Sequence, residues 1–222
     1  MTGTLKTTLI QNPSSADVNI TLGTSGEVTL AKSPVLNGST SGTLTIAAPA
    51  VAGTNTQTLV AATGTLAPLI SGTAQASTSG TSIDFTSIPS WVKRITVMYN
   101  GVSTSGTSFW LLRLGTGGTP ETTGYDSIGV NAQAGNSLTT STAGFLIYAN
   151  VASYVVSGSM VITNVSGNIW VCSGLVGTST GASVQFPTTG KKTLAGVLDM
   201  VRVTTVNGTD TFDAGSINIL YE

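Results

Sequence analysis

The sequence predicts an all-β fold built from antiparallel sheets, and three observations support this prediction. The 222 residues include 39 Thr, 26 Ser and 27 Gly, which are poor helix formers. Short runs of alternating apolar and polar residues follow one another along the chain, separated by Gly, Asn, Asp and Ser, as expected for strands with one buried face. Asn-Gly pairs at 37–38, 100–101 and 207–208 are typical of β-hairpin turns.

Residues 1–70 form a first region that contains an internal repeat. The segment at 24–31 reads TSGEVTLA and recurs at 40–47 as TSGTLTIA, a spacing of sixteen residues. The region has no aromatic residue and only four charged ones. Aromatic side chains carry much of the buried area of independent cores, and small domains are already marginally stable. We therefore do not expect residues 1–70 to be stable as a monomer.

The apolar side chains of the repeat are expected to form a seam between subunits. Val28 and Leu30 alternate with Thr in the first copy, and Leu44 and Ile46 do so in the second. Alternate residues of a strand share one face, and we predict that this face packs against identical copies. Residues 1–70 would then be an intertwined β shaft or anchor that depends on an oligomer of identical chains. The alternative is a flexible Thr/Gly-rich linker, although disordered segments usually lack such alternation and carry more net charge.

Residues 71–222 are predicted to form a β-sandwich knob. Pro68 and the low-complexity stretch 71–81 mark the junction, and all thirteen aromatic residues follow it. Candidate strands at 81–86, 92–99, 108–114, 143–149, 155–164, 169–175, 193–205 and 216–220 predict an antiparallel, jelly-roll-like sandwich. The polar, glycine-rich stretch 115–142 is expected to be a long loop, and loops of that length are usually functional or mobile.

Charge and cysteine content exclude several classes of partner and cofactor. Eight Lys and Arg are scattered singly against nine Asp and Glu, so we expect no nucleic-acid or anionic-membrane partner. With one cysteine and no histidine the chain predicts neither a disulfide framework nor a Cys/His zinc site. No apolar run approaches the roughly 20 residues of a membrane helix, and the first eleven residues do not resemble a signal peptide. We expect no cofactor and no metal.

An enzyme is disfavoured because reactive groups are scarce. Without histidine, neither a Ser-His-Asp triad nor a Cys-His pair can form. Cys172 lies in a strand-like run and is expected to be a buried structural thiol. A calcium site at Asp210 and Asp213 would lack enough ligands. A carboxylate pair for glycoside hydrolysis would have to come from six sparse acids, which are more often caps and turn formers: Asp84, Glu121, Asp126, Asp199, Asp210 and Asp213.

Binding is easier to support than catalysis. Tyr125 and Asp126 lie together in the expected loop at 115–142, and such a pair can stack on a sugar ring and accept hydrogen bonds from its hydroxyls. The same pair is also common in ordinary loops. Trp110 belongs to the run 109–112, which is apolar on both faces, so one face is expected to meet a neighbouring subunit.

Two segments resemble proteins of tailed bacteriophages. The stretch at 42–56 reads GTLTIAAPAVAGTNT and continues to ATGTL at 62–66, and it is similar to a segment of tail-fibre and other virion surface proteins. The stretch at 80–103 reads GTSIDFTSIPSWVKRITVMYNGVS and resembles the opening of a globular domain in similar proteins. The resemblance implies a homotrimeric, β-structured protein displayed on a phage particle.

These observations lead to the expectation of a non-enzymatic structural protein on the virion surface. In the leading interpretation it is a short trimeric tail fibre or receptor-binding protein, whose knob contacts a host surface glycan. In the alternative it is a capsid decoration, or head-fibre, protein held to the shell by residues 1–70. A polysaccharide depolymerase is disfavoured by the short chain and the few acids. The expected partners are further copies of the chain, other virion proteins bound through the N-terminal region, and the glycan.

Overall fold

The computed structural model describes residues 68–133 and 137–222 in full and, before them, only the backbone of five short strands. The chain divides into two compact units, Met1–Gly64 and Thr65–Glu222. Every regular element described is a β-strand, so the predicted all-β class is confirmed. The described residues contain no helix long and apolar enough to span a bilayer.

The strands described in the first unit form two small antiparallel sheets. One sheet contains β1 (Leu9–Gln11), β2 (Val18–Leu22) and β3 (Val28–Leu30), and the other contains β4 (Val35–Asn37) and β5 (Thr43–Thr45). Strand β3 lies in the first copy of the sixteen-residue repeat and β5 in the second. The register places Leu22 opposite Val28 and Leu36 opposite Leu44. Each copy of the repeat thus supplies the second strand of an antiparallel pair.

Fourteen strands are described in the second unit. They are β6 (Ile70–Ser71), β7 (Gln75–Ala76), β8 (Ser82–Phe85), β9 (Arg94–Thr104), β10 (Trp110–Thr116), β11 (Thr119–Pro120), β12 (Tyr125–Asn131), β13 (Ser137–Ser141), β14 (Phe145–Ile147), β15 (Val156–Ser166), β16 (Ile169–Thr178), β17 (Val184–Thr193), β18 (Met200–Thr205) and β19 (Phe212–Tyr221).

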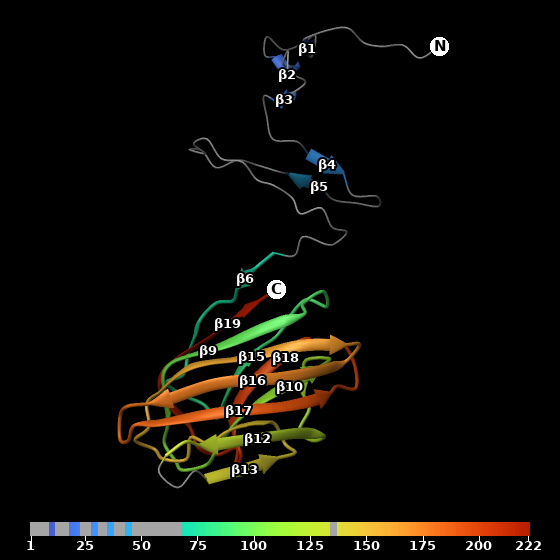
Figure 1. Cartoon of the computed structure of the whole chain (residues 1–222). Coiled ribbons are helices and arrows are strands. Elements are labelled where there is room, and N and C mark those ends of the chain that lie inside the picture. The colour runs from blue at the N-terminus through green and yellow to red at the C-terminus, as the bar shows by residue number, and fades with distance from the viewer. Residues whose placement is uncertain are drawn as a thin grey trace. The chain divides into compact units, whose positions relative to one another are not determined.

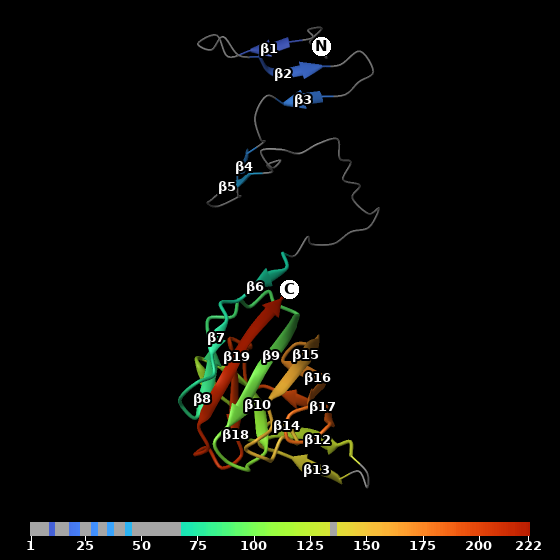
Figure 2. The same ribbon diagram turned by 90° about the vertical axis from the view of Figure 1, so that its left-hand side faces the viewer.

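These strands form two antiparallel sheets that pack as a β-sandwich (Figures 1 and 2). The small sheet has the order β11-β10-β18-β8, and β14 also pairs with β10. The large sheet has the order β13-β12-β17-β16-β15-β9-β19-β6, and β7 also pairs with β19. One apolar core lies between the sheets. Its buried residues include Trp110, Leu112 and Val203 from the small sheet and Ile95, Ile162 and Phe186 from the large sheet.

Alternation along the strands produces this core. In β16, Trp170, Cys172 and Val176 are buried, whereas Val171 and Leu175 between them are exposed. Successive side chains of a strand point to opposite faces, so one face of the large sheet covers the core and the other forms an outer surface.

The Asn-Gly pair at 100–101 makes a bulge inside β9 and not the predicted hairpin turn. Around it, three steps along β9 pair with two steps along β15. Gly101 has a φ of 63°, and its N–H donates to the Oγ of Ser157 at 3.0 Å. A glycine with positive φ suits a bulge as well as a turn, so the dipeptide alone does not distinguish them.

The long loop expected at 115–142 is a wrong prediction. Strands β11, β12 and β13 lie within it. In β12 the buried positions include Ser127 and Gly129, while the apolar Ile128 between them is exposed. The usual pattern of apolar residues inside and polar residues outside is therefore reversed here, which hides the strand in the sequence.

The strand expected at 193–205 is also corrected, because β17 ends at Thr193 and β18 begins only at Met200. Strand β17 itself is not apparent in the sequence, where Pro187 and Gly190 interrupt the apolar pattern. Proline normally disrupts a central strand because it lacks an N–H donor. The ladder between β12 and β17 includes Thr188 but not Pro187, so Pro187 is paired only on the side of β16.

Candidate binding site at the distal end of the sandwich

The strands of the large sheet define two ends of the sandwich. At the proximal end, β6 pairs with the last residues of β19, and Ile70 lies opposite Tyr221. Tyr221 also lies opposite Ile95 near the start of β9. Val102, seven residues further along β9, lies opposite the first residue of β15. At about 3.3 Å per residue this distal end is roughly 23 Å from the proximal one.

Five loops meet at the distal end, at residues 77–81, 105–109, 148–155, 179–183 and 206–211. Backbone hydrogen bonds join some of them: Ser105 N–H donates to the carbonyl of Thr211 at 2.8 Å, and Phe212 N–H donates to that of Gly80 at 2.8 Å. Asp210 is the only charged residue in the five loops. Its carboxylate accepts from the N–H of Ser108 at 2.9 Å. The distal loops therefore offer mainly small hydroxyl, glycine and apolar groups.

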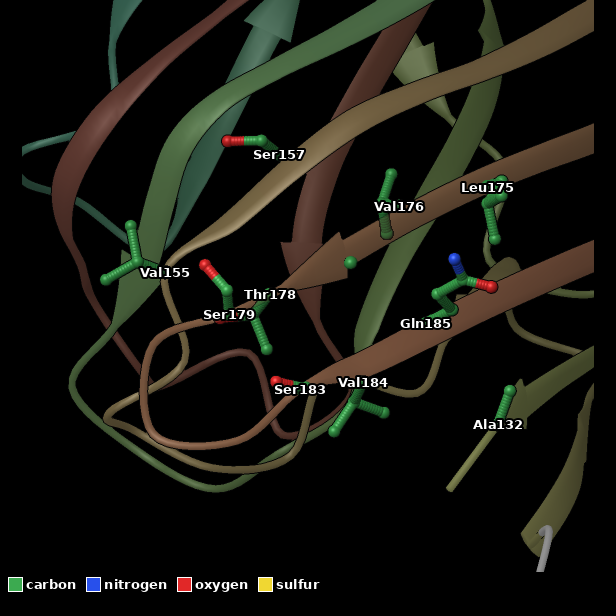
Figure 3. Close-up of a pocket in the computed structure, with 11 residues that line it drawn as sticks. Ala132, Val155, Ser157, Leu175, Val176, Thr178, Ser179, Ser183, Val184 and Gln185 are labelled. Carbon is green, nitrogen blue, oxygen red and sulfur yellow. The ribbon is translucent and has the colours of Figure 1, made fainter. Parts of the chain in front are cut away.

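A hollow of about 650 Å³ opens beside these loops on the outer face of the large sheet. In Figure 3, Ser157, Ser179 and Ser183 lie on one side of it, and Gln185 lies on the other. Gly177 is opposite both Ser157 and Gln185 in the register. A Cβ at Gly177 would lie 2.7 Å from the carbonyl oxygen of Val184, so glycine permits the close approach of β16 and β17 beside the hollow. The lining residues are Ala132, Val155, Ser157, Leu175, Val176, Gly177, Thr178, Ser179, Ser183, Val184 and Gln185.

Two features of β15 position Ser157 at the hollow. The Oγ of Ser157 accepts from Gly101 N–H in the β9 bulge, so its own proton remains able to donate. The next residue, Gly158, has a φ of 135°, and a Cβ there would lie 2.5 Å from the carbonyl oxygen of Leu175. Only glycine permits β15 and β16 to approach so closely, and this approach holds the hydroxyl next to the end of β16.

The rim on the same side as Ser157 is fixed by the loop at 179–183. The Oγ1 of Thr178 donates to the carbonyl of Thr180 at 3.0 Å and accepts from its N–H at 3.0 Å. Gly181 has a φ of 80°, and a Cβ there would lie 2.7 Å from the Oγ of Ser153, so this loop packs closely on the loop at 148–155. A rim held in this way loses little conformational freedom on binding.

The most buried ion pair lies at the proximal end. Lys192, whose side chain is 5% exposed, places Nζ 2.5 Å from Oε2 of Glu121 and donates to the carbonyl of Thr123 at 2.8 Å. Burial alone would raise the pKa of Glu121, but the hydrogen bonds from Lys192 and from Ala195 N–H outweigh it and lower this pKa. The pair ties β17 to the segment between β11 and β12.

The other described ion pairs also lie outside the hollow. Arg202 binds Asp84 in a bidentate manner, with distances of 2.6 and 2.5 Å, and this hydrogen bonding raises the pKa of Arg202. The remaining two join Arg94 to Glu222 and Lys191 to Asp126. The lining of the hollow contains no charged side chain. It can therefore bind a ligand through hydrogen bonds and apolar contacts, but it has no charge to recognise an ion.

The structure separates Tyr125 from Asp126. The ring of Tyr125 is 3% exposed and meets Phe145 edge-on at 5.2 Å, and its hydroxyl accepts from Leu114 N–H at 2.7 Å. Burial raises the pKa of Tyr125. Asp126 is exposed on the outer face of β12, 3.6 Å from Lys191. The buried ring has no free face for a sugar, so the expected stacking of Tyr125 on a glycan is corrected.

The run at 109–112 is likewise covered by the chain itself. Trp110 is 2% exposed, donates from Nε1 to Thr104 Oγ1 at 3.2 Å, and lies edge-on to Phe212. Leu111 and Leu112, which alternate in direction, are both fully buried. Neither face of this run is left for a neighbouring subunit, contrary to the expectation.

The seam residues are only partly described. Val28 and Leu30 lie in β3 and Leu44 lies in β5, where the backbone alone is described. Ile46 lies outside the described residues. The subunit seam therefore stays a prediction.

The remaining acids are each bound to a local donor. A carboxylate oxygen of Asp199 accepts from Gly118 N–H at 2.9 Å, and Asp213 accepts from the hydroxyl of Ser103. Within the described residues, no group of three or more His, Cys, Asp or Glu is placed to hold a metal ion. Cys172 is buried as expected, and burial raises its pKa.

Sequence reasoning missed the hollow. Its one sequence signal is the stretch GTSTGAS at 177–183, a hairpin connection of small residues, and such connections are common. No family model, curated protein or solved structure matches this chain.

Proposed function

We propose that this chain is a non-enzymatic structural protein of a tailed-phage virion, a short trimeric tail fibre whose jelly-roll-like knob faces the host surface. Residues 1–70 would attach it to the particle and hold three copies together. The observation that carries the proposal is the polarity of the sandwich, that is, the difference between its proximal and distal ends. The chain enters at the proximal end, and the nearly uncharged loops and the hollow lie at the distal end.

The polarity supports an attachment role because an anchored protein presents the end opposite its anchor. Binding residues are often found on loops that a rigid scaffold positions, and here five loops extend from one sandwich. The alternating apolar residues of the repeat, and the antiparallel pairing of its strands, support the role assigned to residues 1–70.

The ligand class follows from the lining of the hollow. Hydroxyls of Ser157, Ser179 and Ser183 and the amide of Gln185 are donors and acceptors without charge. Val155 and Leu175 add apolar surface. A neutral sugar residue of a host surface glycan has the matching combination of hydroxyls and C–H faces, whereas an anionic sugar would bury its charge without a partner.

The test compares two tryptophan variants of the full chain on a panel of neutral and anionic bacterial surface polysaccharides. Ser183→Trp fills the hollow from its exposed rim, and Thr193→Trp adds the same ring at an exposed position at the proximal end of β17. We expect the wild type and Thr193→Trp to bind neutral polysaccharide and Ser183→Trp to lose at least tenfold in affinity. Equal binding by both variants, or binding to anionic polysaccharides alone, would contradict the proposed site.

The position on the particle needs its own measurement. Gold-labelled antibody against the chain should mark the tail of the particles that carry it. Label over the capsid would contradict the tail-fibre assignment and favour the alternative, a capsid decoration protein. Release of reducing sugars from a bound polysaccharide would contradict the non-enzymatic role and favour a depolymerase.

A further inference from the structure

Most edge strands of the two sheets are short or capped. Strands β6, β7 and β11 contain two residues each, and β11 includes Pro120. The edge of β8 is capped where Gln75 Nε2 donates to the carbonyl of Asp84 at 2.5 Å. In β14, Leu146 N–H donates to Ser127 Oγ and its carbonyl accepts from Thr188 Oγ1. Side chains of the large sheet thus occupy the free backbone groups of β14.

Strand β13 differs from all of these. It has five residues and pairs with β12 in an unbroken register, from Ser137 opposite Asn131 to Ser141 opposite Ser127. It contains no charged residue and no proline, and among the described residues no strand pairs with its other side. Figure 1 shows it at the border of the large sheet. Charges, prolines and bulges are the usual protection of an open edge, and β13 has none of them.

The sequence of β13 is suited to antiparallel pairing with itself. It reads SLTTS, so pairing centred on Thr139 places Ser137 opposite the partner's Ser141. Leu138 then lies opposite the partner's Thr140. No like charges meet, and small hydroxyl side chains face one another across the join.

Self-pairing would also cover an exposed leucine. Leu138 is 68% exposed, more than any other large apolar residue described in this unit. In the centred register the two copies of Leu138 are diagonal neighbours about 7–8 Å apart, within reach of long side chains. Exposed Ile128 on β12 lies opposite Thr140 and continues this apolar strip.

We propose that β13 pairs with β13 of a second copy of the chain, so that two large sheets join edge to edge. This contact is two-fold and isologous, whereas a trimer requires a three-fold axis, so the inference goes beyond the proposed function. A second copy is favoured over an unrelated strand because every copy carries the same uncharged edge, which reads nearly alike in both directions.

A cysteine scan of the full chain tests the register. In Thr139→Cys the two new cysteines are directly opposite, with Cα atoms about 4.5–5.5 Å apart, which a disulfide can bridge. In Ser137→Cys they are four residues out of register, about 13 Å apart, which it cannot. We expect mild oxidation to cross-link Thr139→Cys into covalent dimers and to leave Ser137→Cys uncross-linked. Cys172 is buried in both.

A charge scan tests whether the contact forms without a cross-link. Sedimentation over a wide range of concentration should show the wild type doubling its mass, from trimer to hexamer, or from monomer to dimer if the proposed trimer is wrong. Leu138→Lys should abolish the doubling, and Val165→Lys, at a valine that is 61% exposed, should retain it. The proposal is overturned if the wild type does not double, if both lysine variants behave alike, or if Ser137→Cys cross-links as readily as Thr139→Cys.

Discussion

Replacement of Glu121 by Gln tests the buried ion pair of the proximal end. The variant leaves Lys192 5% exposed and removes its anionic partner, while the contacts to Thr123 and to the ring of Tyr125 remain. Removing one member of a buried pair costs about 3–5 kcal/mol, and we expect the lower value because Glu121 is 21% exposed. At roughly 2–4 °C per kcal/mol for a unit of this size, the melting temperature should fall by about 6–12 °C.

A neighbouring ion pair and the pH dependence provide the controls. Asp126→Asn removes the partner of Lys191, but both side chains are about 70% exposed, so the change should stay within about 1 kcal/mol. The pKa of Glu121 is lowered in the folded state, so its stabilisation is present above the unfolded pKa of about 4.3 and is lost as the pH falls through the folded pKa. Circular dichroism melts at neutral and acidic pH measure both effects. Equal shifts for the two variants, or a gap that persists in acid, would refute the reasoning.

Two further predictions concern the shaft and the bulge. Ile46→Asp should dissociate the trimer by burying an unpaired charge in each subunit, whereas Thr45→Asp should change trimer stability by at most about 1 kcal/mol. Light scattering measures the mass of each variant, and a wild-type mass near 22.3 kDa would refute the trimer. Gly215→Ala should destabilise more than Gly208→Ala in chemical denaturation. Both glycines have positive φ, which costs other residues about 1–2 kcal/mol, but only at Gly215 would a Cβ meet the carbonyl of Gly101. Equal costs would contradict that packing.

The sequence was sufficient for the fold class but not for every strand. Alternating patterns such as that of β16 mark strands because the buried positions are apolar. In β12 the buried positions include Ser127 and Gly129, and their burial depends on Leu146, which comes from another strand and bonds to Ser127 Oγ. When the buried residues of a strand are small because they pack against a residue distant in sequence, the strand's own sequence shows no alternating pattern that would predict it. The bulge at Gly101 is similar, because its N–H is satisfied by Ser157 in another strand.

The candidate site was less predictable for the same reason. Adjacent positions such as Tyr125 and Asp126 look like a joint site in sequence, but a strand turns neighbours to opposite faces. Ser157, Gly177 and Gln185 come together only through the pairing of three strands. Sequence spacing carries no information about that pairing until the register is known.

The chemistry of the hollow explains why the proposed function requires several copies. A hydrogen bond to a neutral partner contributes only about 0.5–1.5 kcal/mol net, and the lining offers neither charge nor an aromatic ring to add to it. A single hollow would therefore bind a neutral sugar weakly. Linking binding sites makes later binding events intramolecular and can raise overall affinity by about 10² to 10⁴ without any new contact. In the proposed fibre, residues 1–70 supply that linkage, because they hold together three chains, each with its own hollow, at one attachment point on the particle. The aromatic-free shaft and the nearly uncharged distal end are then complementary, because each would be inadequate for attachment without the other.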